Sequence, residues 1–250
     1  MVTRTQCRGR RVSSERPASS GAVEGSAVDR IELICFDMAG TTMIDNGLVL
    51  EAFHRTIDQM GMHGDEAEAA ERYVIDTMGQ SKIDVFTTLF TERGPLANEA
   101  FERHFVEAAQ ELGVSEIPGA TSTVGMLREL GLQVALTTGF SPATREALVE
   151  QLGWADLFRL RISPADAGRG RPAPDMLLTC ALRAQTSSMD ALMAVGDTAS
   201  DMRAGRRAGA GWCVGVLSGT DDEPRLVASG ADQVVASVVD LLGFDSLTSR

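Results

Sequence analysis

The chain has 250 residues, with 35 acidic and 23 basic side chains and a formal net charge of −12. A surface this acidic repels nucleic acid and anionic membranes, so we expect neither as a partner, although a local cation can still hold an anionic substrate in a cleft. No apolar run approaches the roughly 18 residues of a membrane span, and the four cysteines lack CxxC spacing, so we expect a cytoplasmic protein with reduced thiols.

Residues 1–29 are rich in Arg, Ser, Gly and Ala and have almost no periodic apolar positions. This composition predicts a disordered N-terminal tail. The arginines leave a targeting peptide as the alternative. The segment lacks the apolar core of a secretory signal, and Glu15 and Glu24 argue against a transit peptide.

The first structured segment is Ile31-Glu-Leu-Ile-Cys-Phe-Asp-Met-Ala-Gly-Thr-Thr42. Its apolar run has no helical spacing, which is typical of a strand buried on both faces of a parallel sheet. Asp37 falls at the carboxyl end of that strand, where open α/β sheets bind their ligands. The turn that follows is rich in backbone N–H groups, so Asp37 is positioned to attack or bind a phosphoryl group.

A helical segment follows the first strand. Apolar residues recur at helical spacing from Leu48 to Met60, and Gly61 ends this helix. Further helical patterns cover 65–78, 81–91 and 95–112. About 70 residues of helix exceed an ordinary crossover, so we expect an inserted helical domain over 47–117. Its first helix has an apolar face that either forms a homodimer interface or packs inside the insert; the residues are Leu50, Phe53 and Ile57.

From residue 118 onward, helix and strand patterns alternate. The expected helices cover 120–130, 142–152, 175–183, 200–208, 223–229 and 235–242. The expected strands cover 132–138, 157–162, 191–197, 212–217 and 232–235. Alternating units of this length predict a doubly wound parallel sheet with helices on both faces. Residues 30–46 and 118–250 are therefore expected to form one α/β core.

Three strand ends in this core carry oxygen-bearing side chains: Asp37, Thr137 with Thr138, and Asp197. Asp201 lies four residues after Asp197, across a strand-to-helix turn. Three carboxylates at one edge form a hard-oxygen cluster suited to Mg²⁺, which would also remove their mutual repulsion. The alternative for Asp197 and Asp201 is a turn followed by a helix N-cap.

The segment Asp37-Met-Ala-Gly-Thr-Thr42 resembles the first motif of the haloacid-dehalogenase-like hydrolases, and in particular their phosphonatase branch. The resemblance implies that Asp37 is a nucleophile that forms an aspartyl phosphate, with Mg²⁺ as cofactor. Most phosphatases of the superfamily have a second aspartate where this chain has Ala39. The backbone carbonyl of Ala39 can still bind the metal, and the turn at Ala39, Gly40 and Thr41 is expected to hold phosphoryl oxygens.

Two further segments resemble the second and third family motifs. In Thr137-Thr-Gly-Phe140, the resemblance assigns the Thr138 hydroxyl and the Gly139 N–H to phosphoryl binding, although Thr137 can equally be the inward hydroxyl. In Gly170-Arg-Pro172, Arg171 matches the cation that pairs with the nucleophile and the phosphoryl group. Arg169 is assigned to the surface, and the alternative for Arg171 is a solvated loop.

The insert contains Met78-Gly-Gln-Ser-Lys-Ile-Asp84, which resembles the segment of the phosphonatase branch whose lysine forms a Schiff base with the substrate aldehyde. Lys82 matches that lysine. A C–P bond leaves a poor carbanion, whereas a protonated imine next to it accepts the electrons as an enamine. No general acid is then needed at position 39. The alternative for Lys82 is a solvated charge in the first turn of a helix.

The chain departs from the phosphonatase pattern at three positions. Val85 replaces a histidine, Leu48 a cysteine and Phe140 a tyrosine. We expect cleavage of a C–P bond in a small carbonyl-bearing phosphonate such as phosphonoacetaldehyde. The alternatives are a phosphatase acting on a small phosphate monoester and a non-catalytic phosphate-binding protein.

Overall fold

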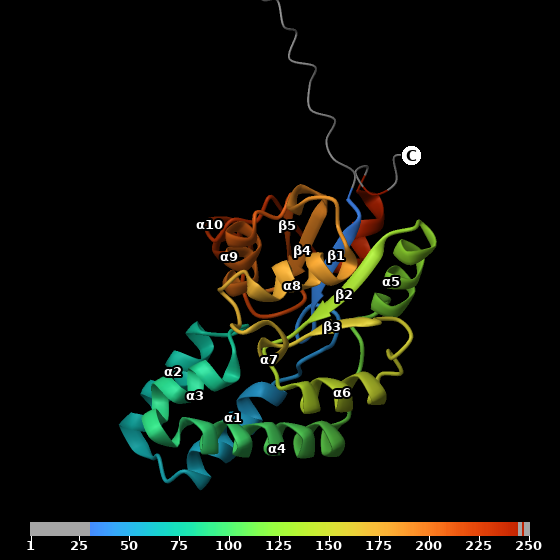
Figure 1. The fold of residues 1–250 in the computed structure, drawn as a ribbon. Helices are drawn as coiled ribbons and strands as arrows, with labels where there is room; N and C mark the ends of the chain where they lie inside the picture. The colour runs from blue at the N-terminus through green and yellow to red at the C-terminus, as the bar shows by residue number, and fades with distance from the viewer. Residues whose placement is uncertain (1–30, 245–246, 248–250) are drawn as a thin grey trace, which may run out of the picture.

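The computed structural model describes residues 31–244 and residue 247, so the tail expected at 1–29 lies outside the described residues. Within residues 31–244, six parallel strands form one sheet in the order β3-β2-β1-β4-β5-β6 (Figure 1). The strands are β1 (Leu33–Asp37), β2 (Gln133–Thr137), β3 (Leu160–Ile162), β4 (Leu192–Gly196), β5 (Trp212–Val216) and β6 (Gln233–Val235). This topology confirms the predicted doubly wound α/β fold.

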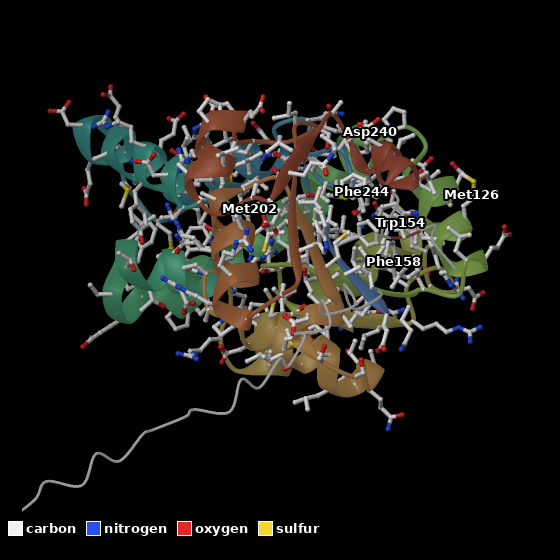
Figure 2. The ribbon with its side chains drawn as sticks, turned by 90° about the horizontal axis from the view of Figure 1, so that it is seen from above. Met126, Trp154, Phe158, Met202, Asp240 and Phe244 are labelled. Carbon is white, nitrogen blue, oxygen red and sulfur yellow. The ribbon has the colours of Figure 1, made fainter. Side chains whose placement is uncertain are left out.

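Helices cover both faces of the sheet. One face packs against α8 (Asp175–Ala184), α9 (Ala199–Ala208) and α10 (Glu223–Ala228). The other packs against α5 (Ala120–Glu129), α6 (Pro142–Gln151) and the 3₁₀ helix η3 (Val238–Gly243). Successive residues of β1 face opposite sides, so Cys35 joins Met202 in one cluster and Phe36 joins Phe158 in the other. Figure 2 shows Met202 on one side of the molecule and Trp154 and Phe158 on the other.

The register places the functional strand ends together. Asp37, the last residue of β1, pairs with Thr137, the last residue of β2. On the other side of β1, Phe36 pairs with Val195 of β4, and that strand ends at Gly196, one residue before Asp197. Asp37, Thr138 and Asp197 therefore leave the sheet at the same edge.

The chain between β1 and α5 is helical. It contains α1 (Leu48–Gln59), α2 (Gly64–Asp76), α3 (Lys82–Phe90), η1 (Thr91–Arg93) and α4 (Gly94–Leu112). Figure 1 shows these helices as a separate layer beyond the carboxyl end of β1. Helices α1 and α3 pack against α4. Phe53 and Ile57 of α1 are buried in this packing and Leu50 is partly buried, as the interior alternative expects, while a homodimer through these helices stays a prediction.

The two connections between the helical layer and the sheet run side by side. Ile44 donates its N–H to the Ser115 carbonyl at 2.9 Å, and Ile117 donates its N–H to the Thr42 carbonyl at 2.8 Å. An antiparallel bridge joins Met43 and Glu116. The two connecting segments thus pair with each other where the helical layer joins the sheet, next to the turn after Asp37.

The structure differs from the sequence predictions at four elements. β3 begins at Leu160 rather than at 157, because Leu157 and Phe158 close a turn onto the Trp154 carbonyl. The last predicted helix is the 3₁₀ helix η3, which begins after Ser237 because β6 extends to Val235. The short helices α7 (Pro164–Ala167) and η2 (Met189–Ala191) were not predicted. Among the described residues, no helix is long and apolar enough to cross a membrane.

Candidate active site

Three buried carboxylates meet at the carboxyl edge of the sheet. They belong to Asp37 at the end of β1, Asp197 directly after β4, and Asp201 in the first turn of α9, and one oxygen of each lies within 4.8 Å of the others. Burial raises the pKa of Asp37 to about 6 even though Arg171 opposes the shift, and burial followed by repulsion from Asp37 and Asp201 raises the pKa of Asp197. A divalent cation would remove this repulsion. The donor set is three hard oxygens, which suits Mg²⁺.

Asp197 is fixed by donors from two distant loops. Its Oδ1 accepts the Thr41 hydroxyl at 2.9 Å, and its Oδ2 accepts the Thr220 N–H at 2.8 Å. Two glycines allow these loops to approach, because a Cβ at Gly40 would lie 2.4 Å from Asp197 Oδ2 and a Cβ at Gly219 would lie 2.0 Å from it. Gly40 also has φ +82°, a left-handed conformation that favours glycine.

Two residues of the turn after Asp37, Gly40 and Thr41, make hydrogen bonds within the protein. The Thr41 hydroxyl is directed to Asp197, and the Gly40 N–H donates to the Met43 carbonyl at 2.7 Å. Gly40 and Thr41 are absent from the lining of the cavity that contains Asp37, whereas Ala39 lines it. Gly40 and Thr41 therefore lie outside the lining of this cavity, and Thr41 holds Asp197, while their contact with phosphoryl oxygens stays a prediction.

Asp201 combines a structural and an ionic contact. Its Oδ2 accepts the N–H and the hydroxyl of Thr198, which forms the capping box of α9. Its Oδ1 accepts a hydrogen bond from Arg171 Nη1. The helix-cap alternative for Asp201 and its place in the acidic cluster therefore both hold for one side chain.

Arg171 bridges two of the three carboxylates. Its side chain is buried, and Nη2 donates to Asp37 Oδ1 at 2.6 Å while Nη1 donates to Asp201. Burial opposes the charge on the guanidinium, yet the carboxylates of Asp201 and Asp37 raise its pKa above the ordinary value. The planar fork of an arginine makes this double contact possible. Arg169 instead lies at the surface and pairs with Asp175 at 2.9 Å.

A cavity of about 40 Å³ opens onto these groups. Seven of the predicted site residues line it: Asp37, Ala39, Lys82, Thr138, Gly139, Arg171 and Asp197. Of the two threonines, Thr138 faces the cavity, whereas the Thr137 hydroxyl donates to the Phe36 carbonyl at 3.1 Å. The sheet edge and the helical layer therefore supply opposite walls of a single cavity.

Lys82 enters this cavity from the helical layer. It is the first residue of α3, and its N–H donates to the Gly139 carbonyl at 3.2 Å. Its side chain is buried, with Nζ 5.9 Å from the ring centroids of both Phe101 and Phe140. Burial lowers the pKa of the Lys82 amine, and Asp45 is the foremost of the carboxylates that oppose this shift. The solvated-charge alternative for Lys82 is wrong.

The segment before Lys82 fits closely against the sheet domain. A Cβ at Gly139 would lie 2.4 Å from the Gln80 carbonyl oxygen, one at Gly79 would lie 2.3 Å from Thr198 Oγ1, and one at Gly170 would lie 2.4 Å from Ser81 Cβ. Glycines on both sides therefore permit this contact. Sequence reasoning missed these pairs, since the glycines contact residues far away in the chain.

Sequence reasoning also missed four polar residues of the site. Asp45, Thr198 and Thr220 line the cavity, and Glu102 of α4 accepts hydrogen bonds from Ser141 next to it. Asp45 belongs to Asp45-Asn46-Gly47, a sequence typical of a turn, which concealed a second role. The only available signal was a carboxylate eight residues after Asp37, close to the motif but without a motif of its own.

A buried aspartate at a strand end, bridged by an arginine to an acidic cluster and facing a helical layer across one cavity, is an arrangement that suits a hydrolase on this fold. A family model described as haloacid dehalogenase-like hydrolase matches residues 31–209. The chain belongs to this family of hydrolases.

Among curated proteins, the chain resembles phosphonoacetaldehyde hydrolases. It is 31% identical over 217 residues to that of Bacillus cereus strain B4264, covering 77% of this chain and 78% of the relative. It is 33% identical over 218 residues to that of strain AH187, with the same coverage.

Solved structures show the same fold. A hydrolase from Pseudomonas syringae has a TM-score of 0.74 at 22% identity, with 86% of this chain and 97% of that chain covered. A phosphonoacetaldehyde hydrolase-like protein from Oleispira antarctica has a TM-score of 0.72 at 23% identity, with 88% and 95% covered. At these identities the likeness concerns the fold alone.

Proposed function

We propose that this protein is a Mg²⁺-dependent hydrolase that cleaves the C–P bond of a small carbonyl-bearing phosphonate such as phosphonoacetaldehyde. The observation that carries the proposal is Lys82. It is the only lysine among the 250 residues, against 22 arginines, and it lies buried in the cavity that contains Asp37. An amine can form an imine, whereas a guanidinium does not, so a single lysine at this place suits covalent chemistry.

The proposed reaction divides between the two walls of the cavity. Lys82 Nζ forms an iminium with the substrate carbonyl, and Asp37 attacks phosphorus. The electrons of the breaking C–P bond enter the iminium and give an enamine, while the phosphoryl group passes to Asp37 as an aspartyl phosphate that water later hydrolyses. Arg171 neutralises Asp37 and the transferred group, and Thr138 and Gly139 face the phosphoryl position.

Mg²⁺ is the proposed cofactor, held by the side chains of Asp37, Asp197 and Asp201 and by the carbonyl of Ala39. When bound, it would neutralise the carboxylates and polarise a phosphoryl oxygen. The buried triad supports this proposal, because three carboxylate oxygens close together fit a hard divalent cation. Without a cation, burial and repulsion raise the pKa of Asp197, and among the described residues Arg171 alone forms ion pairs with Asp37 and Asp201.

Ala39 supports C–P cleavage over ester cleavage. It lines the cavity beside Asp37 and offers no proton for a leaving alcohol. General acid catalysis contributes typically about 10²–10⁴-fold, so an ester hydrolase without it would be slow or limited to activated esters. An iminium removes that need, since the carbon fragment leaves as an enamine.

Hydrolysis of a small phosphate monoester is the second candidate. This candidate needs only the residues of the sheet side. Arg171 contacts Asp37 and Asp201 directly, and these contacts do not involve Lys82. Val85 and Phe140 also favour this candidate. Both belong to the buried apolar cluster, whereas the resemblance to the phosphonatase branch would imply proton-carrying side chains at these two positions.

Comparing phosphonoacetaldehyde with p-nitrophenyl phosphate, with and without Mg²⁺, tests the proposal. We expect faster turnover of the phosphonate, loss of activity with EDTA, and recovery with Mg²⁺. Lys82→Arg keeps the charge but loses the amine, and should abolish phosphonate cleavage while Asp37 still captures BeF₃⁻ with Mg²⁺. Full phosphonate activity in Lys82→Arg, or preference for the ester in the parent, would reject C–P cleavage through an imine.

A further inference from the structure

Asp45 lines the same cavity as Lys82, Asp37 and Asp197. It lies three residues before the first residue of α1, and its Oδ1 accepts the Val49 N–H at 3.2 Å, which fixes the carboxylate beside the start of that helix. The side chain is half-buried. Burial raises the pKa of the Asp45 carboxyl, with the Val49 N–H and Lys82 opposing the shift.

Imine formation needs a group that carries protons between nitrogen and oxygen. Four residues that line the cavity have apolar side chains, which cannot carry a proton: Ala39, Val49, Met78 and Phe140. A reaction through Lys82 therefore requires a proton carrier at another position of this cavity.

Charged groups near Lys82 are Asp45 from the loop before α1, Arg171 and Asp37 from the sheet side, and Glu102 from α4. Asp197 also lines the cavity, and its oxygens accept hydrogen bonds from Thr41 and Thr220. Three of the groups near Lys82 are engaged as well. Asp37 and Arg171 pair with each other, and Glu102 accepts the N–H and the hydroxyl of Ser141. Asp45 is the remaining carboxylate, and it lines the same cavity as Lys82.

We propose that Asp45 is the acid–base residue of imine formation, the carboxylate that takes the proton from the Lys82 ammonium and returns it to the departing oxygen of the substrate. This inference rests on the proposed function, because it assigns a further residue to the same reaction.

Each proton in this reaction has a donor and an acceptor. The Lys82 ammonium gives one proton to the Asp45 carboxylate, and the neutral amine adds to the carbonyl carbon. A proton then passes from nitrogen to oxygen in the adduct, which gives a carbinolamine. Asp45 donates its proton to the hydroxyl, the C–O bond breaks, and water and the iminium form. Overall, the ammonium and the aldehyde become an iminium and water, and the Asp45 carboxylate is regenerated beside the new cation.

A purely structural role for Asp45 would be to accept the Val49 N–H at the start of α1. Asp45→Asn and Asp45→Ser both keep an oxygen that can accept this bond but lose the acid. A purely electrostatic role would be to hold Lys82 protonated. Without Asp45, the pKa of Lys82 would fall further and the amine would react faster, which is the opposite of the effect of losing a proton carrier.

The test measures how fast phosphonoacetaldehyde and borohydride trap Lys82 in the full-length protein with Mg²⁺, followed by mass spectrometry. Loss of general acid–base catalysis predicts a fall of about 10²-fold or more in the trapping rate of Asp45→Asn and Asp45→Ser. The melting temperature and BeF₃⁻ capture at Asp37 should match the parent. Asp222→Asn is the matched control, because Asp222 also accepts a backbone N–H at a helix start, that of α10, and is exposed.

The outcomes separate the two proposals. Trapping in the parent with a slow rate in either folded Asp45 variant supports the role of Asp45. An unchanged or faster rate in a folded variant overturns that role while leaving the imine intact. Failure to trap Lys82 in the parent overturns the imine itself and the role of Asp45 with it.

Discussion

Glu102 of α4 accepts two hydrogen bonds from Ser141, one from the N–H at 3.0 Å and one from the hydroxyl at 2.9 Å. Ser141 is the N-cap of α6, in the sheet domain, and follows directly after Phe140 in the cavity wall. This pair joins the helical layer to the sheet domain next to the place where Lys82 enters the cavity. It therefore ties the position of the amine to the position of the carboxylates.

We expect Glu102→Ala to loosen this junction. A hydrogen bond to a charged group contributes about 1.5–3 kcal/mol, so kcat/KM for phosphonoacetaldehyde should fall roughly tenfold or more. Capture of BeF₃⁻ by Asp37 should change much less, because Asp37 belongs to the sheet. Steady-state kinetics and a capture titration check both parts. Glu99→Ala, on an exposed position of the same helix, is the control, and an equal loss in both variants would contradict the role of the junction.

Gly139→Ala should separate the segment before Lys82 from the sheet domain. The new Cβ would lie 2.4 Å from the Gln80 carbonyl oxygen, a backbone atom that cannot move aside alone. We expect kcat for the phosphonate to fall by at least tenfold. Gly125→Ala in α5 meets nothing within 4 Å, so it should keep activity and stabilise the fold by roughly 0.5–1 kcal/mol. Parallel kinetics and thermal unfolding compare the two, and full activity of Gly139→Ala would contradict the close fit.

Arg171→Lys tests the fork between the carboxylates. A lysine has one ammonium and cannot reproduce the paired contacts to Asp37 and Asp201. Turnover of phosphonate and of p-nitrophenyl phosphate should both drop, by about 10²-fold, since transition-state stabilisation by a fixed donor is typically of this size. Arg169→Lys, at the exposed neighbour, should retain nearly full activity. If Arg171→Lys behaved like Arg169→Lys, the bridging contact would have no catalytic role.

The Lys82 amine should lose its proton at lower pH than an ordinary lysine. Burial lowers its pKa from 10.5, so the reactive neutral amine appears as pH rises through a value below 10.5. The unfolded chain binds this proton more tightly, and the contribution of Lys82 to stability therefore increases with pH across that window. Because the chain has one lysine, the rate of carbamylation by cyanate at Lys82 can be followed by peptide mass spectrometry against pH. A midpoint at or above 10.5, the value expected after unfolding in urea, would contradict the buried position.

The sequence allowed prediction of those features that follow from strand topology. Asp37, Thr138 and Asp197 each end or follow a strand, so a parallel sheet brings them to one edge without further information. The direction of the Thr41 hydroxyl could not be predicted, because its acceptor, Asp197, is 156 residues away. Asp45 escaped notice for a different reason: its local sequence is fully explained by a turn, and its second environment arises only when α3 brings Lys82 to the same cavity.

In the proposed mechanism, one cavity holds the carbon part of the substrate on Lys82 while Asp37 receives the phosphoryl group. Mass spectrometry of the Mg²⁺-loaded parent, quenched with borohydride during turnover of phosphonoacetaldehyde, tests this most directly. We predict a reduced adduct on the peptide that contains Lys82, no adduct in Lys82→Arg, and release of inorganic phosphate that requires Asp37. Phosphate release from phosphonoacetaldehyde at the parent rate in Lys82→Arg or in Asp37→Asn would contradict the account.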